Sequence, residues 1–125
     1  MRLSGSETIL AVDDDPSILD LVGEILKPMG YKVLLANSGE QALELIASHQ
    51  DAIDLLLTDI MLPGIKGQEL ARTMLNAHPD ISVLFMSGYI RPSMANSNKV
   101  RGFEAFLQKP FSPSDMLRKM RKLLD

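Results

Sequence analysis

The sequence predicts an α/β fold with one doubly wound, five-stranded parallel sheet and helices on both of its faces. Five apolar segments rich in β-favouring residues alternate with segments of helical periodicity along the 125 residues. Such alternation indicates parallel strands joined by right-handed crossovers. The first, third and fourth of these segments are apolar throughout, as in strands covered on both faces. The length fits a single domain, residues 1–125, in which residues 1–6 are expected to be a flexible lead-in.

The first strand and the first helix have clear local signals. The strand is expected at residues 8–12, and Asp15 and Pro16 then suit the N-cap and the first position of a helix. Gly30 is expected to end this helix. Its apolar residues fall on one stripe made of Ile18, Val22, Ile25 and Met29, with Leu19 and Leu26 beside them.

The middle of the chain contains two strands and two helices. The second strand is expected at residues 32–36, after which Ser38 and Gln41 form a capping box that begins the second helix. The third strand is expected at residues 53–58, and the third helix ends before Pro79. The apolar residues of the two helices are Ala42, Leu43 and Ile46, then Leu70, Ala71, Met74 and Leu75.

The C-terminal part is expected to contain the fourth strand at residues 81–86 and the fifth at residues 103–107. Residues 90–100 give the weakest helical pattern because they include three adjacent poor helix formers. Ser112 and Pro113 begin the last helix, in the same way as Asp15 and Pro16 begin the first. The inner side of the last helix is predicted to contain Leu117, Met120 and Leu124.

Composition and charge exclude several classes of function. The chain has no cysteine, which excludes disulfides and leaves a zinc site only His49, His78 and carboxylates. The net charge is −3, and no basic cluster occurs outside the last helix, so we expect no direct nucleic-acid partner. No apolar run is long enough to cross a membrane and no signal peptide is visible, so the expected location is cytoplasmic. The basic cluster is expected to solvate an exposed helix face and consists of Arg118, Lys119, Arg121 and Lys122.

Polar side chains follow the predicted strands at the points where the apolar runs stop. Asp13 and Asp14 follow the first strand, Asp59 the third, Ser87 the fourth and Lys109 the fifth. Because the carboxyl ends of parallel strands lie along one edge of a sheet, we expect these five residues to converge there. Open α/β sheets bind their ligands at that edge.

The chemistry of this set favours phosphoryl transfer. Three carboxylates at one edge repel one another and raise each other's pKa unless a cation intervenes. An all-oxygen set suits a hard ion, Mg²⁺ first, with water and a backbone carbonyl completing its coordination. Lys109 adds a positive charge and Ser87 a hydroxyl donor. A carboxylate nucleophile such as Asp59, together with these groups, can accept a phosphoryl group.

Four segments of the chain resemble the receiver domains of two-component response regulators. They occur in order, and the resemblance covers about residues 7–124. It implies a flavodoxin-like fold with strand order 2-1-3-4-5, in which the order reverses between the first and third strands. The amino-acid sequence of several segments is also similar to that of receivers attached to hybrid sensor histidine kinases. The four segments are ILAVDDDP (9–16), TDIMLPG (58–64), FMSGY (85–89) and FLQKPF (106–111).

The resemblance implies a role for each acidic residue. Asp59 is the phospho-acceptor. Asp14 and Asp59, with the backbone carbonyl of Met61, are the expected ligands of Mg²⁺, and Asp13 acts through water. Asp15 is explained by its place as an N-cap and is assigned no chemistry.

The resemblance also implies a switch. Lys109 is expected to bind the phosphoryl group, and the peptide bond between Lys109 and Pro110 is expected to be cis. Ser87 is expected to move to a phosphoryl oxygen, followed by Phe106 as an aromatic switch. For Phe106, plain core packing stays open as the alternative.

The function implied is phosphorelay signal transduction rather than enzymatic turnover. The phosphoryl group is expected to come from the phosphohistidine of a sensor histidine kinase or phosphotransfer protein, with self-catalysed transfer and slow autodephosphorylation. Since the chain ends just after Leu124, its output is expected to be contact with a downstream protein. The expected contact face comprises the fourth helix, the fifth strand and the last helix.

Three other classes of protein fit the sequence less well. A dehalogenase-type phosphatase would use Asp13 as its nucleophile, but Pro16-Ser17 departs from its motif and there is no room for its cap. A phosphorylation-independent binding module would not need all five strand-end residues. A dinucleotide-binding domain would require a glycine-rich turn after the first strand, which is absent.

Overall fold

The computed structural model describes residues 2–49, 52–88 and 105–125. Its strands are β1 (Thr8–Val12), β2 (Lys32–Ala36), β3 (Leu55–Asp59), β4 (Ser82–Ser87) and β5 (Phe106–Gln108). Its helices are α1 (Pro16–Leu26), the 3₁₀-helix η1 (Lys27–Met29), α2 (Gly39–Ser48), α3 (Gly67–Ala77) and α5 (Pro113–Leu124).

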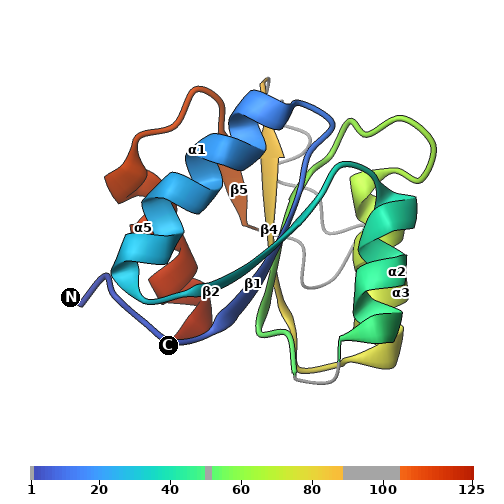
Figure 1. Cartoon of the computed structure of the whole chain (residues 1–125), viewed down its shortest axis with the longest axis horizontal. Helices are drawn as coiled ribbons and strands as arrows, with labels where there is room; N and C mark the ends of the chain where they lie inside the picture. The colour runs from blue at the N-terminus through green and yellow to red at the C-terminus, as the bar shows by residue number, and fades with distance from the viewer. Residues whose placement is uncertain (1, 50–51, 89–104) are drawn as a thin grey trace.

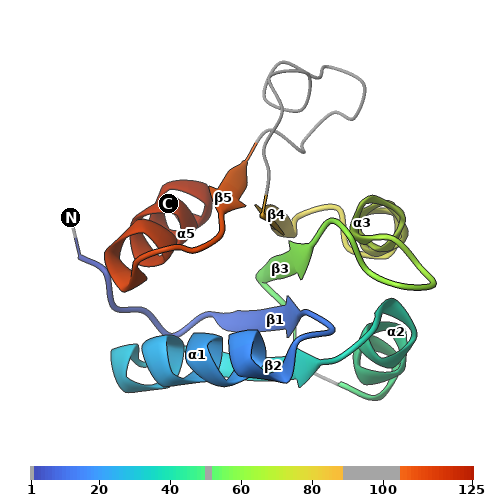
Figure 2. The same cartoon turned by 90° about the horizontal axis from the view of Figure 1, so that it is seen from above.

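The strands form one parallel sheet in the order β2-β1-β3-β4-β5, which confirms the α/β class and the order that the resemblance implies. Helices α1 and α5 lie on one face of the sheet, and α2 and α3 lie on the other (Figures 1 and 2). The reversal of strand order falls between β1 and β3. The carboxyl ends of these two strands therefore flank the place where such sheets bind ligands.

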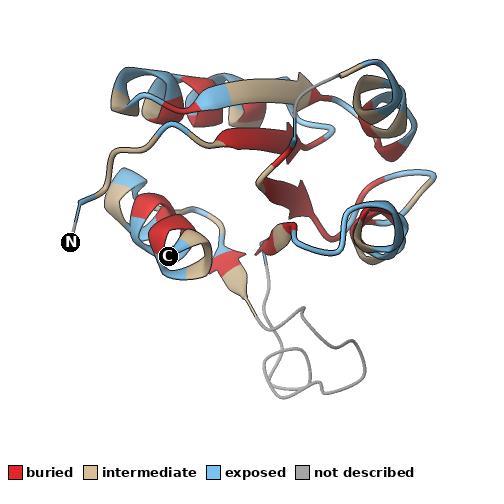
Figure 3. Cartoon of the chain, turned by 90° about the horizontal axis from the view of Figure 1, so that it is seen from below, coloured by how far each residue is buried: buried red, intermediate tan, exposed pale blue. Residues whose placement is uncertain are grey.

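The two faces of the sheet bury separate apolar clusters because successive strand side chains point to opposite faces. Leu10 and Leu56 belong to the cluster under α2 and α3, and Ile9 and Leu57 belong to the cluster under α1 and α5. Every residue of β1 and β3 is buried (Figure 3). Each fully buried leucine or isoleucine contributes about 2 kcal/mol to the free energy of unfolding. The central strands therefore hold the residues that follow them in fixed positions.

Helix α1 begins as predicted but ends earlier. The Asp15 side chain accepts the N–H of Ser17, which confirms the N-cap. The α-helix ends at Leu26 because Pro28 has no N–H to continue the hydrogen-bond pattern, and the chain turns through η1 to Gly30 at φ 98°. The predicted stripe was only partly right, since the buried residues are Leu19, Val22, Gly23 and Leu26, while Ile18, Ile25 and Met29 are half-buried.

The cap of α2 differs slightly from the predicted capping box. Ser38 Oγ accepts the N–H of Gln41 at 3.0 Å, as expected. The Gln41 side chain, however, accepts the N–H of Asn37 at 2.6 Å rather than that of Ser38. The two hydrogen bonds still satisfy two backbone donors at the start of the helix.

Three strands are displaced toward the C-terminus relative to prediction. β3 and β4 end at Asp59 and Ser87, one residue beyond the apolar runs, because Asp59 pairs with Met86 and Ser87 pairs with Gln108. Backbone pairing does not depend on side-chain polarity, so the ladder continues into the polar residues. β5 likewise ends at Gln108. Residues 103 and 104 of the predicted fifth strand, and the weak helical segment 90–100, lie outside the described residues.

The expectation that the basic residues of the last helix all face solvent was wrong for Arg121. This residue is 8% exposed, and its Nη1 donates to both carboxylate oxygens of Glu7 at 2.8 Å. Its guanidinium also donates to Asp125 and to the Tyr31 hydroxyl. The charge can be buried because these partners compensate it. Ser112 caps α5 as predicted.

The residues before β1 lie against Arg121 and its hydrogen-bond partners. The Tyr31 hydroxyl donates to the Leu3 carbonyl at 2.8 Å, and the Gly5 N–H donates to the Met29 carbonyl at 3.1 Å. Residues 2–6, predicted as a flexible lead-in, therefore contact η1 and Tyr31, the residue before β2, in this structure. Among the helices of the described ranges, none has both the length and the apolar composition that a membrane span requires.

Candidate functional site

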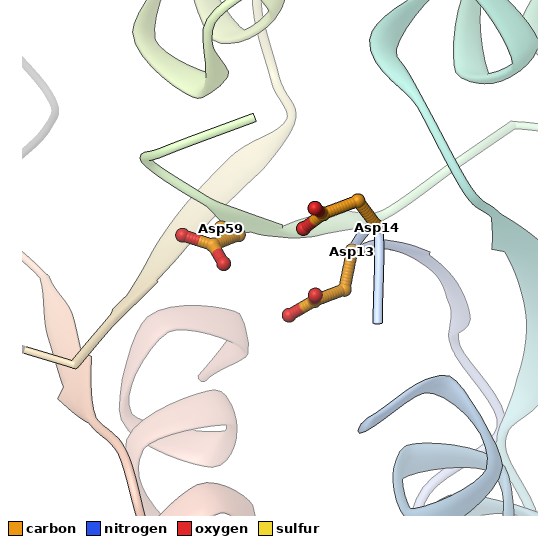
Figure 4. A group of neighbouring side chains, drawn as sticks. All are labelled: Asp13, Asp14 and Asp59. Carbon is orange, nitrogen blue, oxygen red and sulfur yellow. The ribbon is translucent and has the colours of Figure 1, made fainter. Parts of the chain in front are cut away.

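The carboxyl ends of β1 and β3 gather three carboxylates, as the sequence predicts. Asp13 and Asp14 directly follow β1, and Asp59 is the last residue of β3. One carboxylate oxygen from each lies within 4.8 Å of the others. Figure 4 shows the side chains of Asp13 and Asp14 extending from the end of β1 toward Asp59. The three acidic residues therefore form one cluster at the predicted edge of the sheet.

Asp13 is the most enclosed member of the cluster, with no exposed surface. Its N–H donates to the Ala36 carbonyl at 3.1 Å, which continues the pairing of β1 with β2 and fixes the backbone. Its Oδ1 accepts the N–H of Asp15 at 2.9 Å, and its Oδ2 accepts from Lys109 at 2.7 Å. Burial raises the pKa of the Asp13 carboxyl, although the hydrogen bonds from Lys109 and Asp15 oppose the shift.

Lys109 reaches the cluster from the end of β5. Its N–H donates to the Ser87 carbonyl at 2.8 Å, and its peptide bond with Pro110 is cis, as the resemblance implies. Its Nζ lies 2.7 Å from Asp13 Oδ2 and 2.8 Å from Asp59 Oδ2. Burial lowers the pKa of the ammonium, but the hydrogen bonds to the two carboxylates outweigh this effect and the net pKa is raised. Lys109 therefore stays charged and joins the two carboxylates.

Asp59 is held through both of its carboxylate oxygens. Oδ2 accepts from Lys109, and Oδ1 accepts the N–H of Met61 at 2.9 Å. The second contact holds the Met61 peptide beside the Asp59 carboxylate, while Met61 is 69% exposed. Asp59 is 9% exposed, more than Asp13, so it is the more accessible of the two carboxylates that Lys109 binds.

Asp14 completes the cluster on its solvent side. It is exposed, and it takes part in none of the ion pairs within the described ranges. Three carboxyl groups face one ammonium, so the cluster has an excess of acidic groups. An oxygen-only set with excess negative charge and an open side suits a hard divalent cation.

Ser87 and Phe106 lie at the same end of the sheet but not in the carboxylate cluster. Ser87 ends β4 and is 4% exposed. Phe106 begins β5 and is paired in register with Phe85, and the two rings stack with their centroids 5.7 Å apart. The ring of Phe106 is half-buried against the cluster under α2 and α3. This packing agrees with the core alternative and leaves the switch role as a proposal.

Gly67 has a role in the site that the sequence analysis missed. It begins α3, and a Cβ at this position would lie 2.2 Å from the Asp59 carbonyl oxygen. Its N–H donates to the Ile60 carbonyl at 3.1 Å. Only glycine allows α3 to begin this close to β3. The available signal was a glycine inside a turn-rich loop, which does not by itself indicate a close approach.

Comparison with known proteins agrees with this geometry. A model of the response regulator receiver domain matches residues 9–121. The sensor kinase CckA of Brucella abortus is 32% identical over 123 residues, which are 98% of this chain and 13% of the kinase. The response regulator MprA of Mycobacterium leprae is 37% identical over 120 residues, which are 93% of this chain and 50% of the regulator. The chain thus spans half or less of these relatives.

Two solved structures have the same fold. The response regulator TrrA of Thermotoga maritima, in complex with Mg²⁺-BeF, has a TM-score of 0.79 and 32% identity, covering 94% of this chain and 99% of TrrA. The chemotaxis response regulator CheY4 of Vibrio cholerae has a TM-score of 0.84 and 26% identity, covering 96% of this chain and 100% of CheY4. The match to a sensor kinase agrees with the resemblance to receivers of hybrid kinases. Because the family model spans nearly the whole sheet and its helices, the chain belongs to the response regulator receiver domains, the phosphorelay signalling domains of two-component systems.

Proposed function

We propose that this receiver accepts a phosphoryl group on Asp59, with the phosphohistidine of a sensor histidine kinase or phosphotransfer protein as donor. The observation that carries the proposal is the contact of Lys109 Nζ with Asp59 Oδ2 at 2.8 Å, inside a cluster of three carboxylates. An ammonium beside a partly accessible carboxylate is placed to offset the negative charge of an incoming phosphoryl group.

The transfer is a displacement at phosphorus. An oxygen of Asp59 forms the new P–O bond while the P–N bond to the donor imidazole breaks, and the imidazole leaves with the electron pair. Lys109 offsets charge on the phosphoryl oxygens, and the Met61 N–H keeps the carboxylate in place through Oδ1. The product is an aspartyl phosphate on Asp59. The domain catalyses both the transfer and the slow hydrolysis of its own aspartyl phosphate. It is therefore a signalling element and not a turnover enzyme.

The residues present fit Mg²⁺ as the cofactor. Asp14 and Asp59, with the Met61 carbonyl, would hold the ion, and Asp13 would act through water. The excess negative charge of the cluster, its oxygen-only chemistry and the exposure of Asp14 support this assignment. The ion, when bound, neutralises phosphoryl charge that one lysine does not fully offset.

The response is proposed to run through Ser87 and Phe106 to a protein partner in the cytoplasm. Ser87 is placed at the end of β4, next to the strand that ends in Asp59, and Phe106 begins β5. Lys119 of α5 donates to the Phe106 carbonyl at 2.5 Å, so β5 and α5 are joined at this residue. This link supports a partner face that includes β5 and α5. Residues 90–100, where the fourth helix of that face is expected, lie outside the described residues.

Phosphorylation of the purified chain tests the acceptor assignment. A small phosphodonor with Mg²⁺ should add one phosphoryl group, measured by intact mass, and peptide mapping should place it on Asp59. Asp59→Asn should stay unmodified. Asp13 is the competing acceptor suggested by the run of three aspartates, but it is fully buried and both of its oxygens are engaged. A phosphoryl group on Asp13, or full modification of Asp59→Asn, would refute the proposal.

A further inference from the structure

Helix α2 contacts the loop that follows the proposed acceptor. Glu40, in the first turn of α2, accepts the N–H of Ile65 at Oε1 with a distance of 3.1 Å. Ile65 belongs to the loop between β3 and α3, which also carries the Met61 carbonyl. Figure 2 shows this loop running beside the start of α2. No motif in the sequence singles out Glu40.

Two glycines allow this approach. Gly64 has φ 73°, and a Cβ there would lie 2.7 Å from Glu40 Oε1. A Cβ at Gly39 would lie 2.8 Å from Ile65 Cβ. Each glycine therefore removes a side chain that would separate α2 from the loop. The Glu40 carboxylate accepts hydrogen bonds from its own backbone N–H, which has the larger effect, and from that of Ile65. Because these hydrogen bonds lower the pKa of Glu40, its carboxylate is ionised at neutral pH.

The other hydrogen bonds of the loop are local. Met61 N–H donates to Asp59, and the Lys66 ammonium donates to the Leu62 carbonyl at 3.0 Å. Across residues 2–49, 52–88 and 105–125, the Glu40 contact is the hydrogen bond that joins loop residues 61–66 to an element other than β3 or α3. The loop is therefore held, relative to the end of β1 that Asp13 and Asp14 follow, by the burial of Leu62 and by a contact made from α2.

We propose that Glu40 is a positioning residue for the metal site: by holding Ile65 N–H, it sets the place of the loop and of the Met61 carbonyl. This inference rests on the proposed function, because it assumes that Mg²⁺ binds to the acidic cluster. The sequence predicted a site built only from the ends of strands and from the loop after Asp59. The proposed role of Glu40 adds helix α2 to these elements.

The test is the Mg²⁺ dissociation constant, measured by calorimetry without any phosphodonor. Glu40→Ala should bind Mg²⁺ about 3- to 10-fold more weakly, the equivalent of one net hydrogen bond. Glu40→Gln keeps the Oε1 acceptor and should stay within about twofold of wild type by the same reasoning. Glu44→Ala, one turn further along α2 and also exposed, is the matched control for loss of a negative charge. Asp14→Ala should abolish binding.

The outcomes separate this inference from the proposed function. If Glu40→Ala binds like wild type while Asp14→Ala does not bind, the positioning role is refuted and the metal site stands. If Glu40→Gln and Glu44→Ala weaken binding as much as Glu40→Ala, the effect is one of charge and the positioning role is also refuted. If wild type and Asp14→Ala bind alike, the metal site of the proposed function is wrong, and the role of Glu40 falls with it.

Discussion

Lys109 joins two carboxylates whose positions lie 96 and 50 residues away in the sequence. Its ammonium contacts one oxygen of Asp13 and one of Asp59, so the cluster is partly neutralised before any phosphoryl group or metal binds. Asp14 is left as the carboxylate without such a contact among the described ion pairs. The three aspartates are therefore not equivalent, and substitutions of each should have different effects on stability.

Glu7 provides a test of charge at the opposite end of the sheet. Hydrogen bonds from Arg121 hold the pKa of the Glu7 carboxyl below its ordinary value of 4.5. Glu7→Gln should lower the free energy of unfolding by about 1–2 kcal/mol at pH 7, since a charge-assisted pair to a buried guanidinium is lost. A carboxyl with a lowered folded pKa stabilises the protein above its unfolded pKa. That contribution disappears as pH falls through the folded value.

Wild type and Glu7→Gln should therefore converge in urea unfolding experiments as the pH is lowered from 7 to well below 4.5. Glu44→Gln, an exposed change on α2, is the control and should differ little from wild type at any pH. A difference between wild type and Glu7→Gln that persists undiminished at the lowest pH would show that the ion pair is not its cause.

That Asp13, Asp59 and Lys109 lie together could be predicted from the sequence, but the partners of other charged residues could not. Asp13, Asp59 and Lys109 each follow a recognisable apolar strand, and parallel strands bring their ends together whatever the loops do. Arg121 lies among other basic residues, and its burial depends on Glu7, 114 residues away. Glu40 is likewise one of several acidic helix residues, and only the folded loop shows which of them reaches Ile65. A contact between residues that are far apart in the sequence leaves no local pattern.

Among the elements, α3 begins in close contact with the end of β3. Its first residue, Gly67, sits against the Asp59 carbonyl, and its N–H is bound to the Ile60 carbonyl. Gly67→Ala should destabilise the chain by about 1–3 kcal/mol, because the backbone of α3 or β3 must move to admit the Cβ. It should also slow phosphorylation of Asp59, because the loop after the acceptor moves with the start of the helix.

Gly23 is a matched control in the middle of α1. A Cβ there meets its nearest atoms, in Lys27 and Leu35, at 3.8 to 4.0 Å, which is ordinary contact. Gly23→Ala should stabilise the chain by about 0.5–1 kcal/mol through helix propensity. Thermal or urea unfolding of both variants measures the two signs. Equal effects of the two substitutions would contradict the close packing at Gly67.

The types and order of the described elements could be predicted because each has its own local signal, such as the Asp15 and Ser112 caps. The ends were harder to place. β3 and β4 extend into Asp59 and Ser87 because neighbouring strands offer backbone partners there. The end of α1 was placed late because the apolar pattern continues through Pro28, whereas the hydrogen-bond pattern does not.

For the whole molecule, the site combines an apolar base with an excess of negative charge. The central strands are buried on both faces. Their backbone therefore cannot move outward to separate the carboxylates or to expose them to water. Lys109 offsets part of this charge, and in the proposed function Mg²⁺ offsets more of it. Stability of the entire fold should therefore respond to Mg²⁺, since an ion that binds only the folded state stabilises it by mass action.

Asp14→Asn should reverse its effect on stability with the metal content of the solution. In EDTA the variant should be more stable than wild type, because it removes a carboxylate that faces Asp13 and Asp59 without contacting Lys109. With Mg²⁺ at 100 times its dissociation constant, wild type should gain about 2.7 kcal/mol that the variant lacks, and should become the more stable protein. Urea unfolding under both conditions measures the reversal, with Asp20→Asn, an exposed change on α1, as the control. Wild type more stable than Asp14→Asn in EDTA would mean that Asp14 is not repelled by its neighbours, and an equal gain from Mg²⁺ in both proteins would place the ion elsewhere.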